Sequence, residues 1–397
     1  MVQALLDNLS DRLGCPVQLV AVSTHPAADR KAYERIDAEV TVASQRPVEM
    51  AALHVPLALL AGLLRVMRLP WRWACRPSAL RALAEADVVA DLSGISFVDG
   101  RRFVVLVYNT LVVAIPLLLG RPVVKCSQAL GPFRTVVNRT LAQTVLPQVA
   151  AVCARGEATA AHLRTLGLTN VRPATDLAFT MRVPDQVRKQ MQDRLAAVAP
   201  GPYLVVSPSQ VVDTHCRSRG IDYPRIIADF IDAVVNHTGY AVVVIAHSAQ
   251  PADGVNHMND LPLCREVVST TRARERVIFL DEDLLPTELR AVIGEAAMLV
   301  TSRFHAMISG LAERKPMLVI GWSHKYGEVL APFGLSELAM PYEDLTSGEA
   351  MLARTEEMLK RGDELVASIE RHLPAAVAGA ETSFEALAAA LGTGGVR

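Results

Sequence analysis

The 397-residue chain has few cysteines, almost no net charge and no leader-like start, and each shortage argues against a class of protein. Its six cysteines are scattered without any C-x-x-C pair, which argues against a disulfide framework or a structural zinc site and favours a reduced, cytoplasmic setting. The net charge of −1 gives no bulk attraction to nucleic acid. Residues 1–14 have the pattern of an amphipathic helix instead of a signal peptide.

The length and the order of apolar segments indicate two α/β domains. A chain of 397 residues is too long for one ordinary hydrophobic core. Apolar segments that suit buried strands alternate with helical patterns in both halves, and the alternation restarts at Tyr203 after the proline-containing stretch Met181–Pro202. We expect two doubly wound, Rossmann-like domains with parallel sheets facing a cleft, made of residues 1–185 and 200–345, followed by C-terminal helices in residues 346–397.

The segment His54–Trp73 is strongly apolar and contains two tryptophans. Its only fully charged side chains are basic, namely Arg65, Arg68 and Arg72. This pattern predicts either an interfacial helix on an anionic membrane surface or a helix buried between the domains, and the sequence leaves both open.

A second apolar segment, Phe103–Gly120, approaches the length of a membrane span. Asn109, Thr110 and Pro116 interrupt it, and it continues directly into another strand-like segment. We therefore expect a buried crossover helix in preference to a transmembrane helix.

The most informative stretch is Met298–Lys325, which has the order strand, loop, helix, strand. Met298–Thr301 suits a buried parallel strand, and Ser302 follows it at the expected N-cap of a helix. Arg303 and His305 then fall in the first helical turn, where unpaired N–H groups and the helix dipole attract anions.

The next strand of this stretch, Met317–Ile320, delivers His324 and Lys325 just beyond its end. Because ligands bind at the carboxyl ends of parallel strands, both residues should meet Arg303 and His305 around one small, doubly anionic ligand. Taken singly, each of these side chains also fits a solvated cap or a surface charge.

Six short motifs between Ala86 and Glu337 form a recognisable set. They are Gln128-x-x-Gly131-Pro132, Arg155-Gly-Glu157, Asp176-Leu-Ala-Phe179, His247 with its acidic loop, Ser302-Arg303-Phe304-His305-Ala306 and Gly321-Trp-Ser-His-Lys325. In these motifs the chain resembles the polysaccharide pyruvyl transferase family. The resemblance implies a glycosyltransferase-B type of architecture and transfer of the enolpyruvyl group of phosphoenolpyruvate to a sugar diol. The product would be a pyruvate ketal on a cell-surface polysaccharide or glycolipid precursor.

Ketal formation requires an acid for the methylene carbon of phosphoenolpyruvate and fixed positive charge for its phosphate and carboxylate. His305 suits the acid because an imidazolium can donate a proton near neutral pH. Arg303 can bind an oxyanion bidentately and Lys325 can act as a point charge. The family pattern adds Arg155, from the first domain, as a third anion contact. The expected substrate-binding set also includes His324, Ser302, Gln128 and His247.

The sugar hydroxyls need a general base, and the loop after His247 offers Asp253 and Asp260 as candidates. Either carboxylate could equally be a solvated loop side chain. The chemistry needs no metal, and no metal-ligand spacing is evident, so no cofactor is expected beyond phosphoenolpyruvate as donor. The acceptor would be a saccharide, either free or lipid-linked.

Two features depart from the family pattern. The chain starts in what should be the first helix, without the usual strand before it, and the turn at Ser93–Gly94 has one glycine where the family has two. Two other functions also remain open. One is a nucleotide-sugar-dependent glycosyltransferase of the same architecture, and the other is a non-catalytic, membrane-associated polysaccharide assembly protein.

Overall fold

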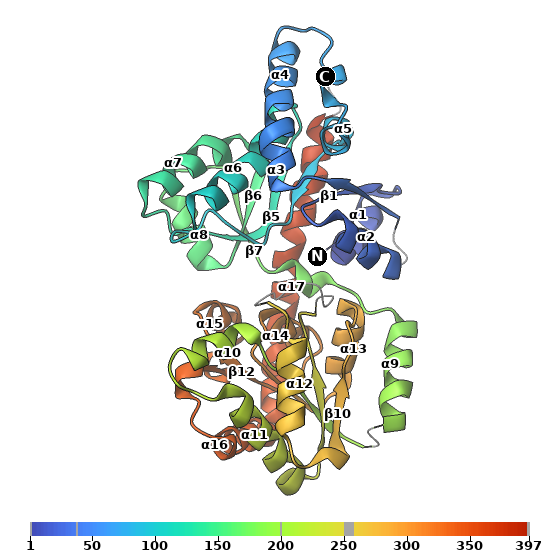
Figure 1. Cartoon of the computed structure of the whole chain (residues 1–397), viewed down its shortest axis with the longest axis vertical. Coiled ribbons are helices and arrows are strands. Elements are labelled where there is room, and N and C mark those ends of the chain that lie inside the picture. Colours follow the sequence, from blue (N-terminus) through green and yellow to red (C-terminus); the bar gives the residue numbers. More distant parts are fainter. Residues whose placement is uncertain (1, 37–38, 199–200, 250–257, 395–397) are drawn as a thin grey trace. The chain divides into compact units, whose positions relative to one another are not determined.

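The computed structural model of the chain describes residues 2–36, 39–198, 201–249 and 258–394 (Figure 1). It divides into two compact units. Unit 1 contains Met1–Met181 and Ala376–Arg397, and unit 2 contains Arg182–Ala375.

Unit 1 is built on a parallel sheet with the strand order β3-β5-β6-β7, and β4 pairs with β5 beyond β3. A separate parallel pair, β1-β2, lies earlier in the chain. The strands are β1 Leu19–Ser23, β2 Val40–Ser44, β3 Val89–Asp91, β4 Ile95–Ser96, β5 Val123–Leu130, β6 Ala151–Arg155 and β7 Val171–Ala174.

Helices connect these strands in the expected crossover pattern. The longer ones are α1 Val2–Leu13, α2 Pro26–Arg35, α4 Val55–Val66, α5 Ser78–Glu85, α6 Phe103–Leu118, α7 Val136–Val145 and α8 Glu157–Arg164. Shorter turns are α3 Pro47–Glu49, η1 Met50–His54, η2 Arg72–Cys75, η3 Leu146–Gln148 and η4 Leu177–Thr180.

Unit 2 contains a six-stranded parallel sheet in the order β10-β9-β8-β11-β12-β13. The strands are β8 Tyr203–Ser207, β9 Ala241–Ile245, β10 Val277–Leu280, β11 Met298–Thr301, β12 Met317–Gly321 and β13 Ala339–Pro341. Every residue of β8, β9, β11 and β12 is buried. The chain winds outward from β8 to β10 and then returns to β11 on the other side of β8. The crevice between the carboxyl ends of β8 and β11 is therefore the switch point at which such sheets bind ligands.

The helices of unit 2 flank this sheet. They are α9 Asp185–Val198, α10 Gln210–Arg217, α11 Tyr223–Thr238, α12 Leu261–Thr270, α13 Pro286–Glu295, α14 Phe304–Ala312, α15 Lys325–Leu330, α16 Gly348–Lys360 and the first part of α17 Gly362–Gly394, up to Ala375. Short turns are η5 Arg274–Arg276, η6 Ala331–Phe333, η7 Ser336–Leu338 and η8 Tyr342–Asp344.

The predicted class of fold is confirmed, because both units are Rossmann-like with parallel sheets. The residues after 346, expected as separate C-terminal helices, are divided between the two units: α16 and the first part of α17 belong to unit 2, and the rest of α17 belongs to unit 1.

The two apolar segments are both helical. Phe103–Gly120 contains α6, which connects β4 to β5 and buries Val113, Ile115 and Pro116, as expected of a crossover helix. The helical stretch Pro47–Val66 is long and apolar enough to cross a membrane by length and composition, and only 28% of its apolar window is buried. Its exposed side chains include Leu59 and Leu63, and Trp73 beyond it is 54% exposed.

A buried ion pair lies at the centre of unit 1. Lys125 on β5 donates to Asp91 on β3, and both side chains are almost completely buried. Asp91 also accepts from the backbone N–H of Ser93 at 3.0 Å. Burial opposes ionisation of Asp91, but Lys125 and the Ser93 hydrogen bonds outweigh it and lower the pKa of this carboxyl. The pair therefore links two neighbouring strands through charges that cannot be solvated separately.

We expect Lys125→Met to destabilise unit 1 by about 3–5 kcal/mol, because it leaves the Asp91 carboxylate buried without its cation. Tryptophan fluorescence during urea unfolding can measure this in a Trp322→Phe background, where the remaining tryptophans, Trp71 and Trp73, both belong to unit 1.

The matched control is Arg164→Met, which removes an ion pair with Glu157 whose side chains are 63% and 79% exposed. It should change the unfolding free energy by less than about 1 kcal/mol. Equal destabilisation by both variants would contradict the importance of the buried pair.

Candidate functional site

The candidate site begins at the crevice between β8 and β11. The Ser207 carbonyl at the end of β8 accepts hydrogen bonds from the Ser302 backbone N–H at 3.0 Å and from Thr301 Oγ1 at 3.1 Å. The Ser302 hydroxyl contacts the Tyr223 hydroxyl at 2.6 Å, and the Ser302 carbonyl accepts from the Tyr326 hydroxyl at 2.9 Å. These contacts fix the loop that carries the basic residues.

The predicted helix cap at Ser302 is wrong. Helix α14 starts at Phe304, its N-cap is Arg303, and no side chain caps it. Ser302 is 1% exposed, and its hydroxyl is directed to Tyr223, so it supports the loop and is not placed to contact a ligand.

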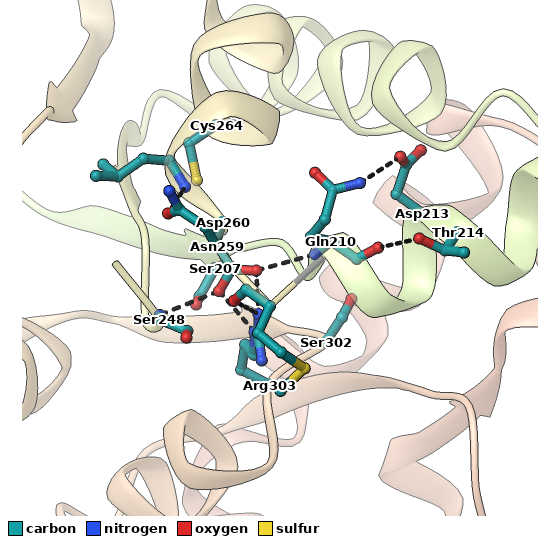
Figure 2. A network of polar contacts seen from close by, with 12 residues as sticks. Ser207, Gln210, Asp213, Thr214, Ser248, Asn259, Asp260, Cys264, Ser302 and Arg303 are labelled. Carbon is teal, nitrogen blue, oxygen red and sulfur yellow. Dashed lines mark hydrogen bonds and ion pairs between the residues drawn. The ribbon is translucent and has the colours of Figure 1, made fainter. Parts of the chain in front are cut away.

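Arg303 forms a two-pronged contact with Asp260, the residue before α12 (Figure 2). Its Nε donates to Asp260 Oδ2 at 2.6 Å, its Nη2 donates to Oδ1, and Nη2 also donates to the Met258 carbonyl at 2.8 Å. Only 12% of the Arg303 side chain is exposed. Among the described residues, these contacts involve Nε and Nη2 and none involves Nη1.

Asp260 accepts two further hydrogen bonds from backbone N–H groups, from Gln210 at 2.9 Å and from Ser248 at 3.1 Å. The residue is fully buried, and Figure 2 shows the contacts converging on its carboxylate. Burial raises the pKa of Asp260, while the Arg303 contact and the backbone donors oppose that rise. This carboxylate does not fit the general base expected from the sequence, because both of its oxygens are enclosed by donors. It instead positions Arg303.

His247 follows β9 at the same edge of the sheet. Burial, together with the positive charge of His305, Arg303 and Arg290, lowers the pKa of His247 to about 3. His247 is therefore a neutral imidazole at physiological pH, and the same electrostatic coupling shows that it shares one positive region with His305 and Arg303.

His305 and Lys325 lie on the two helices that begin at this edge. His305 is exposed in the first turn of α14, with its ring edge-on to Phe304 at 5.5 Å between centroids. Lys325 begins α15, and its ammonium lies over the Trp322 ring, 5.7 Å from the centroid. Trp322 also stacks with His215 of α10, with 5.3 Å between the ring centroids. The Lys325 side chain is thus held against an aromatic support.

Two residues predicted to bind substrate, His324 and Gln128, contact other parts of the protein instead. His324 is 76% exposed at the side chain and approaches Glu328 at 3.5 Å. Gln128 is fully buried in unit 1, where it donates to the Asp91 carbonyl at 2.7 Å and accepts from Ser96 at 2.8 Å. Gln128 is therefore a structural link between strand ends, and nothing in its contacts exposes it to a substrate.

Arg155 ends β6 in unit 1 and donates from Nη1 to Asp176 at 2.7 Å. Its role beside the unit 2 residues stays a prediction. Asp253, the other proposed base, lies outside the described residues.

Four residues contribute in ways that were not anticipated. The Gln210 backbone N–H belongs to α10, which the sequence reading missed. Trp322 and His215 support Lys325, and Arg290 is a 2% exposed arginine of α13 whose Nε is 3.4 Å from Ser309 Oγ. An arginine amid the apolar pattern of a core helix is the one sequence signal that could have identified a buried charge at this site.

Solved structures with the same fold cover nearly the whole chain. A UDP-GlcNAc 2-epimerase from Neisseria meningitidis, bound to UDP-GlcNAc, is 9% identical with a TM-score of 0.63, and the match covers 98% of this chain and 96% of that one. A UDP-GlcNAc 2-epimerase from Methanocaldococcus jannaschii, in complex with UDP-GlcNAc and UDP, is 10% identical with a TM-score of 0.52, covering 90% and 89%. Anabaena Alr3699/HepE, in complex with UDP and glucose, is 12% identical with a TM-score of 0.52, covering 99% and 94%.

These similarities show that the protein has a glycosyltransferase-B-like α/β fold. No curated protein sequence matches the chain significantly. The model of the polysaccharide pyruvyl transferase family matches residues 14–324, and the chain belongs to that family. It is accordingly a transferase of polysaccharide biosynthesis, and a saccharide acceptor follows from the family.

The low pKa of His247 predicts a pH-dependent contribution to stability. The unfolded chain protonates His247 near its ordinary value of 6.5, whereas the folded chain resists protonation until the pH approaches about 3. The unfolded state therefore binds more protons in this window, and His247 lowers stability as the pH falls from about 6.5 toward 3.

We expect the melting temperature of His247→Gln to fall less than that of the parent protein when the pH is lowered from 7 to 4. Differential scanning calorimetry at several pH values measures this difference. His237→Gln, which replaces an exposed histidine of α11, is the control and should follow the parent. Parallel curves for His247→Gln and the parent would contradict an imidazole that stays neutral in the folded protein.

The geometry of Asp260 also predicts how its removal should affect kinetics. If Asp260 positions Arg303, then Asp260→Asn should raise the KM for the anionic substrate at least tenfold and lower kcat less. A general base would show the reverse, a large loss of kcat at nearly constant KM. The control is Asp281→Asn, which disrupts the exposed Arg265–Asp281 pair of the same unit and should leave both constants unchanged.

Proposed function

We propose that the protein transfers the enolpyruvyl group of phosphoenolpyruvate to a sugar diol and forms a pyruvate ketal on a cell-surface polysaccharide or glycolipid precursor. The observation that carries this proposal is the Arg303 guanidinium, held by buried Asp260 at the switch point of a parallel sheet. Membership of the polysaccharide pyruvyl transferase family supports the same reaction class.

The donor site suits a small ligand with two anionic groups. Asp260 fixes the plane of Arg303, so its remaining edge can bind one oxyanion with little loss of side-chain freedom. Lys325, supported by Trp322, offers a point charge from the next strand end. His247 stays neutral and can donate or accept a hydrogen bond without adding charge. Phosphate and carboxylate groups of phosphoenolpyruvate match this arrangement.

The reaction then needs one proton donor at the methylene carbon. His305 protonates C3, and a sugar hydroxyl adds to C2, losing its own proton. The C2–O bond to phosphate breaks and phosphate leaves with the bonding electrons. The second hydroxyl then adds to C2, gives up its proton to the departing phosphate or to solvent, and closes the ketal. Arg303 and Lys325 stabilise the phosphate as it leaves. Neither a metal nor a further cofactor takes part in this scheme.

Incubation of the protein with phosphoenolpyruvate and a panel of free and lipid-linked oligosaccharides tests the proposal. Mass spectrometry should detect the acceptor gaining pyruvate less water, together with release of one phosphate per product. Thermal stabilisation by phosphoenolpyruvate but not by UDP or UDP-sugars would agree with it. Sugar transfer from a nucleotide sugar, without phosphoenolpyruvate, would instead identify a glycosyltransferase.

Variants of the two central residues should differ in kind. Arg303→Lys keeps a positive charge but loses the planar fork, so binding of phosphoenolpyruvate should weaken by about 1.5–3 kcal/mol. His305→Gln keeps a hydrogen-bonding group but has no proton to transfer, so kcat should fall roughly a hundredfold or more with binding nearly preserved. Titration calorimetry and single-turnover kinetics separate the two effects. Near-full ketal formation by His305→Gln would exclude His305 as the acid.

We also propose that the exposed face of α4 and the Arg-rich turn after it contact the inner surface of the membrane, which would make the protein peripheral and cytoplasmic. Leu59 and Leu63 are 54% and 58% exposed, and Arg68 is exposed beyond them. Leu59→Ser with Leu63→Ser should lower binding to vesicles containing anionic lipid in a flotation assay. Unchanged flotation would argue against this contact.

A further inference from the structure

A second exposed apolar surface lies in unit 1, at the first turns of α6 and α7. Phe103 and Val104 start α6 and are 64% and 73% exposed, and Val136 and Val137 start α7 and are 80% and 46% exposed. Val105 is 37% exposed. We call these five residues the α6/α7 surface. The rest of α6 buries apolar side chains, so the exposure is concentrated at its start.

The two helix starts are held beside each other by Asp99. Its carboxylate accepts from the Arg134 backbone N–H at 2.6 Å, from Thr135 Oγ1 at 2.8 Å and from Asn138 Nδ2 at 2.9 Å. Asn138 also donates to the Phe97 carbonyl at 2.8 Å. Asp99 precedes α6, whereas Thr135 is the N-cap of α7, and the two helices pack against each other in Figure 1. The α6/α7 surface is therefore one fixed patch.

The charged residues that flank the two helix starts are basic, apart from Asp99, whose carboxylate is held by the hydrogen bonds described above. Arg101 and Arg102 precede α6, and Arg134 and Arg139 flank the start of α7, and all four are exposed. Among the described residues, no carboxylate forms an ion pair with any of these four arginines. The sequence from Gly100 to Gly156 contains no Asp or Glu at all, although the chain as a whole has a net charge of −1. Acidic residues are thus absent from this segment, which is bounded by Asp99 and Glu157.

We propose that the α6/α7 surface docks on a lipid bilayer with anionic head groups. Large apolar side chains ringed by guanidinium groups match the two layers of such a bilayer, because the apolar groups enter the acyl boundary and the cations pair with phosphates. A protein interface would ordinarily present both signs of charge around its apolar centre, and here carboxylates are missing from the entire segment.

The position of the surface also bears on the acceptor, and this step rests on the proposed function. Because α6 follows β4 and α7 follows β5, both helices start at the carboxyl edge of the unit 1 sheet, where α/β sheets bind their ligands. Docking through these helix starts holds that edge close to the bilayer. A saccharide carried on a lipid is the acceptor that such an edge would reach.

Vesicle flotation with the full-length protein tests the docking surface. The vesicles are phosphatidylcholine alone and phosphatidylcholine with 30% phosphatidylglycerol, a composition in the range of about 20–40% that gives a strong negative surface potential. The protein should bind the anionic vesicles, and binding should decline with added salt. Phe103→Ser with Val104→Ser should reduce partitioning about tenfold or more, because two large apolar side chains no longer enter the bilayer.

Arg101→Glu with Arg102→Glu should reduce binding to the anionic vesicles by a similar factor. Two control pairs replace side chains of the same kinds elsewhere. Val20→Ser with Val198→Ser removes two exposed valines, and Arg354→Glu with Arg371→Glu reverses two exposed arginines of unit 2. Neither control should alter partitioning by more than about twofold.

Thermal stabilisation by phosphoenolpyruvate provides a readout that is independent of docking. It should persist in the Phe103 and Val104 variant, which shows that the variant is folded and that its donor site is intact. If the parent shows no such stabilisation but still binds vesicles, the proposed function fails and the docking surface stands.

Three results would overturn the docking proposal. The first is flotation of the Phe103 and Val104 variant equal to that of the parent. The second is loss of flotation only in the α4 variant, with both α6/α7 variants unchanged. The third is concentration-dependent self-association, measured by light scattering, that Phe103→Ser with Val104→Ser abolishes while the parent binds neither kind of vesicle. That outcome would assign the surface to a second copy of the chain.

Discussion

The bidentate contact between Arg303 and Asp260 is the interaction on which the unit 2 site depends. A guanidinium on a loop would ordinarily sample many orientations, and binding an anion would then require ordering it. Here a fully buried carboxylate holds the fork, and the Gln210 and Ser248 backbone N–H groups hold the carboxylate. The carboxyl ends of β8, β9 and β11 thus support one side chain. Removing a single partner would leave a buried charge without its counter-ion, and this strongly destabilises a folded protein.

The positive charge of this region is limited because one of its histidines, His247, stays neutral. Arg303, Arg290 and His305 all act on His247, and together with burial they keep its imidazole neutral. The site can therefore place a histidine beside a bound anion without the repulsion that another cation would add to its neighbours. In the proposed function, the negative charge of bound phosphoenolpyruvate would act on His247 in the opposite direction and raise its affinity for a proton. Anion binding and proton uptake at this edge are coupled by electrostatics alone.

The sequence predicted the frame of the site better than its contacts. Strand β11 has the bounds expected from the apolar run Met298–Thr301, and β12 extends the expected Met317–Ile320 by one residue, because buried parallel strands have a strong local pattern. The pairing of Arg303 with Asp260 joins residues 43 positions apart, and no periodicity encodes it. Ser302 had the residue type and position of an N-cap, but Tyr223 from α11 competes for its hydroxyl. Asp260 likewise looked like a solvated loop carboxylate, and only tertiary structure shows that it is buried.

The exposure of the apolar start of α6 was likewise not predictable from the local sequence pattern. A run such as Phe103–Leu118 is apolar on every side, so its sequence predicts burial without showing which end is covered. The fold covers the middle and the end, where Val113 and Ile115 reach the core, and leaves Phe103 and Val104 outside. Because Asp99 anchors the neighbouring start of α7, the exposed end cannot turn inward without giving up three hydrogen bonds. The apolar patch is thus maintained by a polar contact, and the arginines beside it fit the anionic surface that we propose as its counterpart.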